Sequence, residues 1–336
     1  MKKRDVISVG SALRDVMYYT SDTDVIKNPK NDPIRLKLMC VEYGAKLQSD
    51  KVYFAFGGGG ANTSINFAGL GLKTGVLASI GYDLDGRGIK EHLEFSGVDT
   101  GLLRITQDHR TGFSFLVVDE KSGEHTAFVY YGSARDLSVP KSALQQNPAD
   151  WYYVSSIYSR KWREVMERLG DTKSSRIAWN PGSRQLKAGY RGLKRFVSQT
   201  SVLILNKDEA TELTLSQPKT KRAGSTKQML QQLHSWGPEI VVITNSRKGA
   251  FAYDGKEHYY MKSPNDKPKD TTGAGDCYGS SFVAGIIRYN GDIKKAMKLA
   301  QVNATALVHS IGAQNGFLKW KDLPKNLKKR PAKRKR

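Results

Sequence analysis

Short runs of apolar residues recur along the chain, and the segments between them carry apolar residues at helical spacing. Continuous runs rich in Val, Ile and Leu that end in turn residues are typical of strands buried on both faces. The predicted strands are 6–10, 76–81, 152–156, 176–180, 201–205 and 239–244. Because helical segments alternate with these strands, we predict a mainly parallel sheet with helices on both faces, a Rossmann-like three-layer α/β domain.

Two stretches break this pattern. Residues 34–56 alternate loosely between apolar and polar side chains, and residues 112–131 repeat the alternation around a Lys-Ser-Gly turn at 121–123. Alternation of this kind is typical of antiparallel strands with one exposed face. We therefore expect two hairpin-like insertions outside the main sheet.

Composition narrows the class of protein. The chain has 336 residues, enough to bury a large core. No apolar run approaches the ~18 residues of a membrane-spanning helix, and the run after the basic start is too short for a signal peptide. The two cysteines, Cys40 and Cys277, exclude a disulfide framework. We expect a cytoplasmic protein without a membrane partner.

The charge is unusual, at +22 from 54 Lys and Arg against 32 Asp and Glu. Residues 319–336 contain ten basic residues and one acid, which is +9 and leaves +13 for the rest. A run of like charges is typically solvated and disordered, and it attracts polyanions without sequence specificity. We predict a disordered tail at 319–336 that binds polyanions weakly.

The stretch 270–287 combines polar residues, glycines and an apolar helical pattern. The spacing of Tyr278, Phe282 and Ile286 predicts a helix that begins near Asp276. Free N–H groups and the helix dipole favour an anion at such an N-terminus. A carboxylate there suits a group that removes a proton from a hydroxyl. A capped helix is the other interpretation, but it explains only one of the two aspartates that flank Thr-Thr-Gly-Ala-Gly.

Glycines 57–60 and Asn62 form a second glycine-rich segment. A dinucleotide-binding Gly-x-Gly-x-x-Gly requires glycine where Asn62 stands, and a P-loop requires glycine where Leu72 stands, before Lys-Thr. Neither motif fits. Glycines let the backbone approach a ligand, and an asparagine both donates and accepts hydrogen bonds.

Polar residues also follow several predicted strands. Asp15 comes shortly after the first strand, Asn206-Lys-Asp-Glu209 follows 201–205, and Thr244 with Gly249 follows 239–244. Open α/β sheets bind ligands at the carboxyl ends of their strands. A turn or a helix start with acidic residues is the structural alternative at Asp15 and at 206–209.

In this order, the segments resemble the signatures of the ribokinase-like (PfkB) family of carbohydrate and nucleoside kinases, over about residues 4–318. The resemblance implies a kinase domain of residues 1–318, with lid insertions at about 13–56 and 104–131. It assigns these roles: Asp276 is the general base; Gly273, Ala274 and Gly275 form an anion hole; Asp15, Gly57, Gly58 and Asn62 bind the acceptor; Asn206, Thr244, Gly249 and Asn303 bind the nucleotide; Glu209 organises Mg²⁺ through water; Asp270 and Thr272 bind a monovalent cation such as K⁺.

The resemblance implies ATP-dependent phosphorylation of a hydroxyl of a pentose or hexose, with ATP and Mg²⁺ as cofactors. Two positions depart from the family pattern: Leu13, where kinases of ribose often carry a polar residue, and Ser246, in place of a glycine of the nucleotide loop. A nucleoside is the alternative acceptor, because lid aromatics such as Tyr130 can stack on a base. The family lid also predicts a homodimer. The net positive charge, taken alone, favours a third interpretation, a non-catalytic protein that binds nucleic acid.

Overall fold

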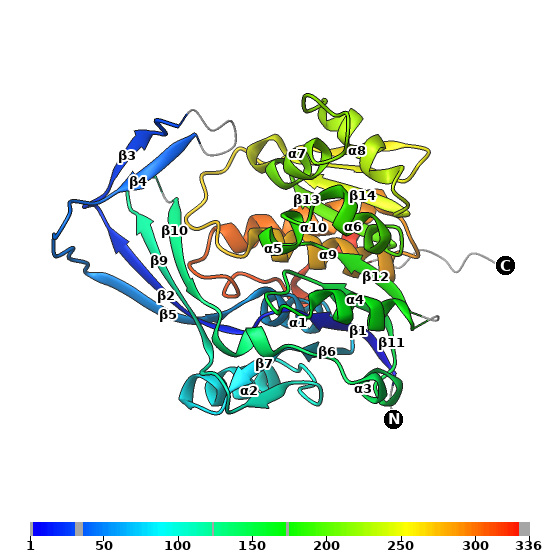
Figure 1. Ribbon diagram of the computed structural model, residues 1–336, viewed down its shortest axis with the longest axis horizontal. Coiled ribbons are helices and arrows are strands. Elements are labelled where there is room, and N and C mark those ends of the chain that lie inside the picture. The colour runs from blue at the N-terminus through cyan, green and yellow to red at the C-terminus, as the bar shows by residue number, and fades with distance from the viewer. Residues whose placement is uncertain (1–2, 31–35, 123, 173–174, 329–336) are drawn as a thin grey trace.

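The computed structural model describes residues 3–30, 36–122, 124–172 and 175–328. Its centre is an eight-stranded sheet in the order β16-β15-β14-β13-β12-β11-β1-β6 (Figure 1). The strands from β6 to β14 pair in parallel, whereas β14, β15 and β16 pair antiparallel. Their bounds are β1 (Arg4–Val9), β6 (Thr74–Leu77), β11 (Ala149–Val154), β12 (Arg176–Trp179), β13 (Val202–Asn206), β14 (Ile240–Thr244), β15 (Ala250–Tyr253) and β16 (His258–Met261). The predicted α/β fold is confirmed, and the antiparallel edge is an addition to it.

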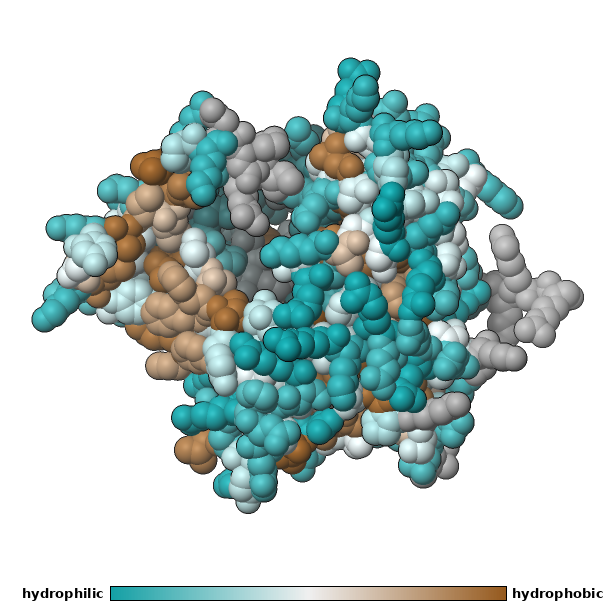
Figure 2. All heavy atoms as spheres, viewed as in Figure 1, coloured by the Kyte–Doolittle hydropathy of each residue, from teal (hydrophilic) through white to brown (hydrophobic). Residues whose placement is uncertain are grey.

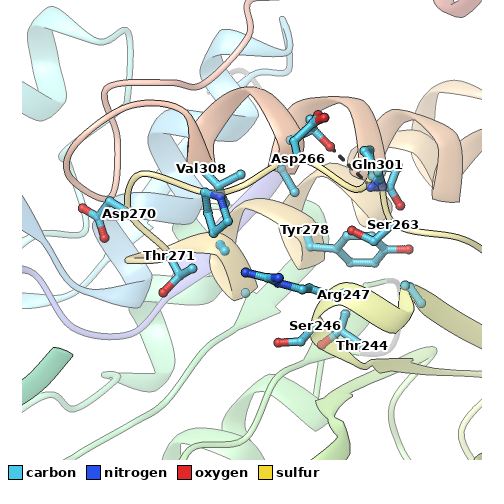
Figure 3. A pocket seen from close by; sticks show the side chains of 18 of the residues that line it. Thr244, Ser246, Arg247, Ser263, Asp266, Asp270, Thr271, Tyr278, Gln301 and Val308 are labelled. Carbon is cyan, nitrogen blue, oxygen red and sulfur yellow. Dashed lines mark hydrogen bonds between the residues drawn. The ribbon is translucent and has the colours of Figure 1, made fainter. Parts of the chain in front are cut away.

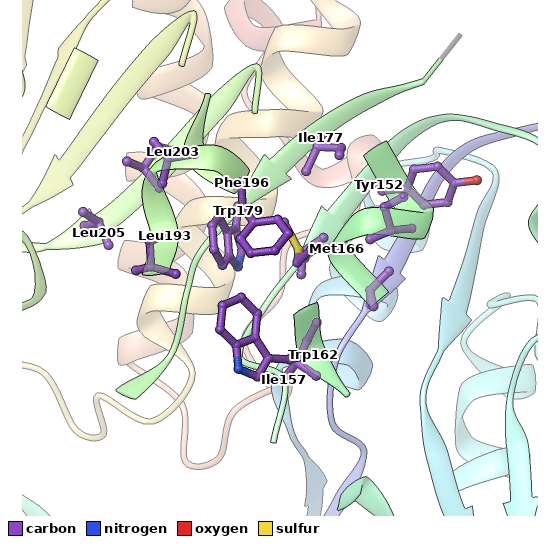
Figure 4. Close-up of a cluster of buried hydrophobic side chains, with 14 of the residues drawn as sticks. Tyr152, Ile157, Trp162, Met166, Ile177, Trp179, Leu193, Phe196, Leu203 and Leu205 are labelled. Carbon is purple, nitrogen blue, oxygen red and sulfur yellow. The ribbon is translucent and has the colours of Figure 1, made fainter. Parts of the chain in front are cut away.

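Helices cover both faces of this sheet. On one face lie α4 (Trp162–Gly170), α6 (Gly189–Val197), α7 (Lys207–Leu215) and α8 (Thr226–His234), and on the other α1 (Gly59–Gly69), α9 (Ala274–Arg288) and α10 (Ile293–Val308). Neighbouring strand residues alternate between the two cores: Tyr152 belongs to the first and Tyr153 to the second. In the first core, Trp179 packs against Phe196 and Trp162 (Figure 4). Burial on both faces explains why these strands are continuously apolar.

The lid is a separate four-stranded sheet in the order β10-β9-β2-β5, beside the body in Figure 1. It contains β2 (Leu13–Thr20), β5 (Lys51–Gly57), β9 (Gly112–Asp119) and β10 (His125–Tyr130). A hairpin of β3 (Asp24–Lys27) and β4 (Lys37–Cys40) extends from it. Both predicted stretches therefore contain strands outside the main sheet, and β9 with β10 is a hairpin as expected. The first stretch is not a hairpin, because β4 pairs with β3 and β5 with β2. Of these strands β5 and β10 are largely exposed, whereas β9 is largely buried.

Two predicted boundaries of these segments are wrong. The segment 76–81 is divided between β6 and β7 (Ser79–Gly81), and β7 pairs with β8 (Arg104–Thr106) rather than with the main sheet. Because residues 104–106 thus belong to the body, the second lid segment begins at Gly112 and not at 104. Between these elements lies α2 (Leu84–Phe95), and η1 (Gly132–Asp136) follows β10.

The basic tail was predicted to be disordered from residue 319, and this is wrong for its first part. Residues 320–328 form η3 (Trp320–Asp322) and α11 (Lys325–Lys328) on the body. Leu323 is buried in the second core, Leu327 is also buried, and the Tyr289 hydroxyl donates to the Leu327 carbonyl oxygen at 2.5 Å. Apolar residues interspersed among the lysines anchor this segment, and residues 329–336 lie outside the described residues. Among the described helices, none is long and apolar enough to cross a membrane.

Candidate active site

The glycine-rich start of α9 forms a backbone cradle. The helix begins at Ala274, two residues before the predicted start, so Asp276 lies in its first turn. Gly273 is the N-cap with φ 75°, and a Cβ there would lie 2.8 Å from Cβ of Ala313, so only glycine fits. A Cβ on Gly275 would meet nothing within 4 Å, which leaves open space above the backbone. The predicted anion hole is incomplete at Ala274, whose N–H donates to the Thr271 carbonyl oxygen at 3.2 Å. Within the described residues, the N–H groups of Gly273, Gly275 and Asp276 have no acceptor, as expected for a first turn ready to bind an anion.

The predicted acceptor residues meet Asp276 across the body. Asn62, on α1, donates from Nδ2 to Oδ2 of Asp276 at 2.8 Å. A Cβ added to Gly57 would lie 1.7 Å from Oδ2 of Asp15, so this glycine makes room for the carboxylate. Gly58 has φ 92° and forms the N-cap of α1. The structure thus brings Asp15, Gly57, Gly58, Asn62 and Asp276 together although 261 positions (276 − 15) separate the two carboxylates.

Burial makes both carboxylates of this site more basic. It raises the pKa of Asp15 to about 7, and the nearby negative charge of Asp276 adds to the effect, while a hydrogen bond with Ser114 opposes it. Burial also raises the pKa of Asp276, and the hydrogen bond from Asn62 opposes that rise. A raised pKa makes a carboxylate a stronger base, and two acidic groups with raised pKa values in one site favour proton transfer chemistry.

A chain of amides holds Asn62 in place. Nε2 of Gln314 donates to Oδ1 of Asn62 at 2.8 Å, and Oε1 of Gln314 lies 2.8 Å from Nε2 of His92 on α2. The Asn62 Nδ2 donates to Asp276, so the Asn62 Oδ1 accepts from the Gln314 Nε2. The Gln314 Oε1 is then left to accept from His92. This order fixes the His92 Nε2 as protonated. Sequence reasoning missed Gln314 and His92 as site residues, since no local motif connects a helix of the body with the C-terminal loop.

Beside the cradle lies a cavity of about 410 Å³ (Figure 3). Six of the predicted residues line it: Asn206, Thr244, Gly249, Asp270, Ala274 and Gly275. Arg247 extends across it from the loop after β14, toward the start of α9. The sequence did not predict the other walls, which include Pro264 and Lys267 from a loop, Gln301 and Thr305 from α10, and Ser122 and Glu124 from the lid. Glycine-poor loops and helix faces of this kind carry no recognisable motif.

Asn303 was predicted to bind the nucleotide, and the structure does not support this. Its side chain is fully buried, and it does not line the cavity. Its Nδ2 donates to Oδ1 of Asn66 at 2.7 Å and to Oγ of Ser281 at 2.8 Å, and its Oδ1 accepts from the Leu318 N–H at 2.8 Å. Both polar atoms are therefore occupied in holding α1, α9 and the C-terminal loop together.

Asn206 and Glu209 form a reciprocal cap on α7. Oδ1 of Asn206 accepts from the Glu209 N–H, and Oε2 of Glu209 accepts from the Asn206 N–H, both at 2.8 Å. Burial raises the pKa of Glu209 to about 7, although its hydrogen bond with Asn206 opposes the rise. Burial disfavours the anionic form of Glu209, and a cation bound nearby would stabilise that form. The described residues contain no group of three or more Asp, Glu, His or Cys side chains that could hold a metal ion, so a metal here would take most of its ligands from water and phosphate.

Asp270 joins two loops beside the cradle. Its Oδ1 accepts from the N–H of Thr272 at 2.8 Å and from the Thr272 hydroxyl at 2.6 Å, and its Oδ2 accepts from the Gly312 N–H at 2.8 Å. Thr272 does not line the cavity of about 410 Å³, whereas Asp270 does. This carboxylate therefore fixes the loop that precedes Gly273 against the loop that contains Ala313.

Comparison with known proteins agrees with this geometry. Residues 4–320 match the model of the pfkB family of carbohydrate kinases. The chain is 25% identical to the 5-dehydro-2-deoxygluconokinase of Bacillus licheniformis, over 81% of this chain and 87% of that protein. It is 26% identical to a nucleoside kinase of Methanothermobacter thermautotrophicus, over 78% and 81% of the two chains. The structure of Arabidopsis thaliana ribokinase complexed with ribose and ATP superimposes with a TM-score of 0.76 at 19% identity, over 97% and 99%.

The fold and the site thus define a phosphotransferase that uses ATP and acts on an alcohol group. The chain belongs to the pfkB family of carbohydrate kinases.

Proposed function

We propose that the protein transfers the γ-phosphoryl group of ATP to a hydroxyl of a sugar that is held between Asp15, Asn62 and Asp276. One observation carries the proposal: Asp276 contacts Asn62 on the acceptor side, while its helix turn lines the nucleotide cavity. The base and the phosphate cradle are therefore adjacent. Positioning of this kind supplies most of the catalysis in phosphoryl transfer.

The proposed step conserves charge and atoms. The acceptor oxygen forms a bond to the γ-phosphorus, and the bond from that phosphorus to the β–γ bridging oxygen breaks, so ADP leaves with the electron pair. The hydroxyl proton moves to the carboxylate of Asp276. The N–H groups of Gly275 and Asp276 stabilise charge on the transferring group. Mg²⁺, when bound through water near Glu209, supplies neutralisation of the nucleotide phosphates. Binding of a monovalent cation by Asp270 and Thr272 stays a prediction.

The acceptor is a pentose or hexose in this proposal, and a nucleoside is the second candidate. Relatives are named as kinases of a sugar acid and of nucleosides, and a structural neighbour binds ribose. A panel of pentoses, hexoses, sugar acids and nucleosides, assayed for a phosphorylated product, tests the proposal. Turnover of a pentose, a hexose or a sugar acid supports the proposal, and turnover of nucleosides alone would select the alternative.

The two cysteines, Cys40 and the buried Cys277, are both free thiols. Free thiols are typical of a reducing compartment, which supports the predicted cytoplasmic location.

Replacing Gln314 by Leu should shift the pH dependence of turnover. Without Gln314, Asn62 loses the partner that orients its amide, and its donation to Asp276 weakens. That donation lowers the pKa of Asp276, so its loss raises the pKa, and turnover then fails at a higher pH on the acidic side. We expect kcat to fall about tenfold to a hundredfold near neutral pH. Profiles of kcat against pH check this.

Two variants of His92 serve as the matched pair for that experiment. His92→Gln keeps an N–H donor toward Gln314 and should resemble the parent protein, whereas His92→Phe removes the donor and should shift the profile in the same direction as Gln314→Leu. If the pH profiles of Gln314→Leu, His92→Gln and His92→Phe all equalled that of the parent protein, the amide chain would have no influence on Asp276.

We also propose that the lid forms a homodimer contact. One face of its sheet packs Met17, Leu116 and Val118 against Ile311 of the body. On the opposite face, Phe54 and Phe128 are 66% and 63% exposed, and apolar side chains gather over the lid in Figure 2. Exposed apolar area of this kind is typical of an interface.

The double substitution Phe54→Ser and Phe128→Ser should convert a dimer into a monomer. Removal of two large apolar side chains from the centre of the proposed contact weakens it by several orders of magnitude in dissociation constant. Light scattering after size-exclusion chromatography measures the mass. Phe95→Ser, at an exposed position of α2, is the control that should leave the dimer intact. A monomeric parent protein would contradict the contact.

A further inference from the structure

A second cavity, of about 610 Å³, lies in the body, where η1 follows the lid strand β10. Its walls come from β8, from η1, from the loop after β11 and from α5 (Ser183–Leu186). Five basic side chains converge on it: Arg104, Arg135, Arg160, Lys161 and Arg184. Figure 2 shows hydrophilic side chains crowded around α5, between the lid and the helices of the body. None of these five residues belongs to the site described above.

The cavity carries an excess of positive charge. Only two carboxylates, Asp108 and Asp136, line it, which gives 5 − 2 = +3 without His109. Asp136 is already engaged, because Nδ1 of His109 lies 3.0 Å from its Oδ2. None of the five basic side chains forms an ion pair with any residue that the structure describes. Like charges gathered in a hollow repel each other and raise the local concentration of anions.

Two of the guanidinium groups are held in place by neighbours. Tyr158 stacks on Tyr131 with 3.4 Å between ring centroids, and the guanidinium carbon of Arg184 lies 4.4 Å from the centroid of the Tyr158 ring. Nη1 of Arg104 donates to Oγ of Ser138 at 2.6 Å. A stacked guanidinium loses little freedom on binding and presents its N–H groups in a fork that matches carboxylate and phosphate oxygens.

The cavity borders the acceptor side of the active site. Tyr158 follows β11 by four residues, and Ser155, directly after that strand, lies beside Gly59 at the start of α1. A Cβ on Gly59 would lie 2.5 Å from Oγ of Ser155 and 3.4 Å from Oδ1 of Asp276. The segment from Ser155 to Tyr158 therefore connects the acceptor side with the cavity. An anion in the cavity is either the charged end of an extended acceptor or a separate ligand.

We propose that this cavity binds a small molecule bearing phosphate or carboxylate groups, through Arg135, Arg184 and the neighbouring basic side chains. The site goes beyond the proposed phosphoryl transfer, since it binds its ligand whether or not a sugar is phosphorylated. The ligand has two sources with the same chemistry. It is the charged end of the acceptor, or it is a separate metabolite that regulates turnover.

Calorimetry at constant ionic strength tests binding directly. The probes are inorganic phosphate and citrate, with ADP present to fill the nucleotide cavity. The variant is Arg135→Ala with Arg184→Ala, and the control is Lys221→Ala with Arg222→Ala, which removes the same charge from an exposed loop. We expect the parent and the control to bind at least one probe, and the cavity variant to bind it at least tenfold more weakly with an unchanged Tm. Equal binding by both variants, or no binding by the parent, overturns the proposal.

Kinetics then separate the two sources. The acceptors are matched pairs that differ in charge, glucose with gluconate and ribose with ribose 5-phosphate. If the charged end of the acceptor binds, the cavity variant loses at least tenfold in kcat/KM for the charged member alone. If a separate metabolite binds, phosphate or citrate changes turnover of a neutral acceptor, and the cavity variant does not respond. Should no acceptor turn over, the calorimetric result still decides the anion site, and only the proposed kinase activity fails.

Discussion

Asp276→Asn is expected to lower kcat about a thousandfold while the protein still binds ATP. The amide has the shape of the carboxylate and still offers an oxygen to Nδ2 of Asn62, which now donates at 2.8 Å. It cannot take the proton of the acceptor hydroxyl, and general bases contribute roughly 10²- to 10⁴-fold. Rapid-quench measurement of a single turnover gives the rate of the chemical step, and calorimetry gives the Kd for ATP, which should change less than about twofold.

Asp208→Asn is the control for this experiment. It removes a carboxylate from the exposed part of the first turn of α7, away from the cradle. Its kcat should equal that of the parent protein. An Asp276→Asn variant with full activity would remove Asp276 from the mechanism, and a variant that lost ATP binding as well would give Asp276 a structural role.

Asp15→Asn should stabilise the protein at neutral pH and at the same time disable acceptor binding. Burial raises the pKa of Asp15 to about 7 from the usual 3.8, so the folded protein holds this proton more tightly than the unfolded chain. Stability contributed by that proton is fully present below about pH 4 and is lost as the pH rises to about 7. At pH 8 the buried charge costs roughly 2–4 kcal/mol, which the neutral amide avoids.

Two measurements test this prediction. The Tm at pH 8 should rise by about 3–6 °C in the variant, and this gain should shrink toward zero near pH 4. The kcat/KM for the acceptor should fall about a hundredfold, because hydrogen bonds from sugar hydroxyls to a charged group are lost. Asp85→Asn, whose side chain is 47% exposed, should show neither effect. A variant destabilised at pH 8 would contradict the buried-charge argument.

Local patterns predicted the central sheet well. The six predicted strands correspond to β1, β6, β11, β12, β13 and β14, because strands buried on both faces have an unmistakable apolar run. The antiparallel pair β15 and β16 was missed, since β16 has only four residues and alternates between exposed and half-buried positions without an apolar run. The ordered segment 320–328 was missed for a different reason. The ten basic residues of 319–336 masked Leu323, which is buried in the second core with α9 and α10, and Leu327, which is also buried.

The candidate site was predictable where its chemistry lies in one short segment. The cradle at Gly273 to Asp276 and the loop at Gly57 to Asn62 each contain their predicted site residues at adjacent positions, and the structure brings the two segments together. Residues that act through space carry no such signal. Gln314 and His92 are known as partners of Asn62 only from the folded chain, and Asn303 has the right residue type in the wrong environment, with no exposed surface.

The most direct test of the account is the ratio of phosphorylated acceptor to ADP formed in the same reaction. A base that faces the acceptor pocket under a lid should activate a sugar hydroxyl rather than water. We predict one phosphorylated acceptor for each ADP, no ADP without an acceptor, and both products formed about a thousandfold more slowly by Asp276→Asn. ADP that accumulates with free phosphate, independent of any acceptor, would contradict the assignment of this site to phosphoryl transfer onto an alcohol.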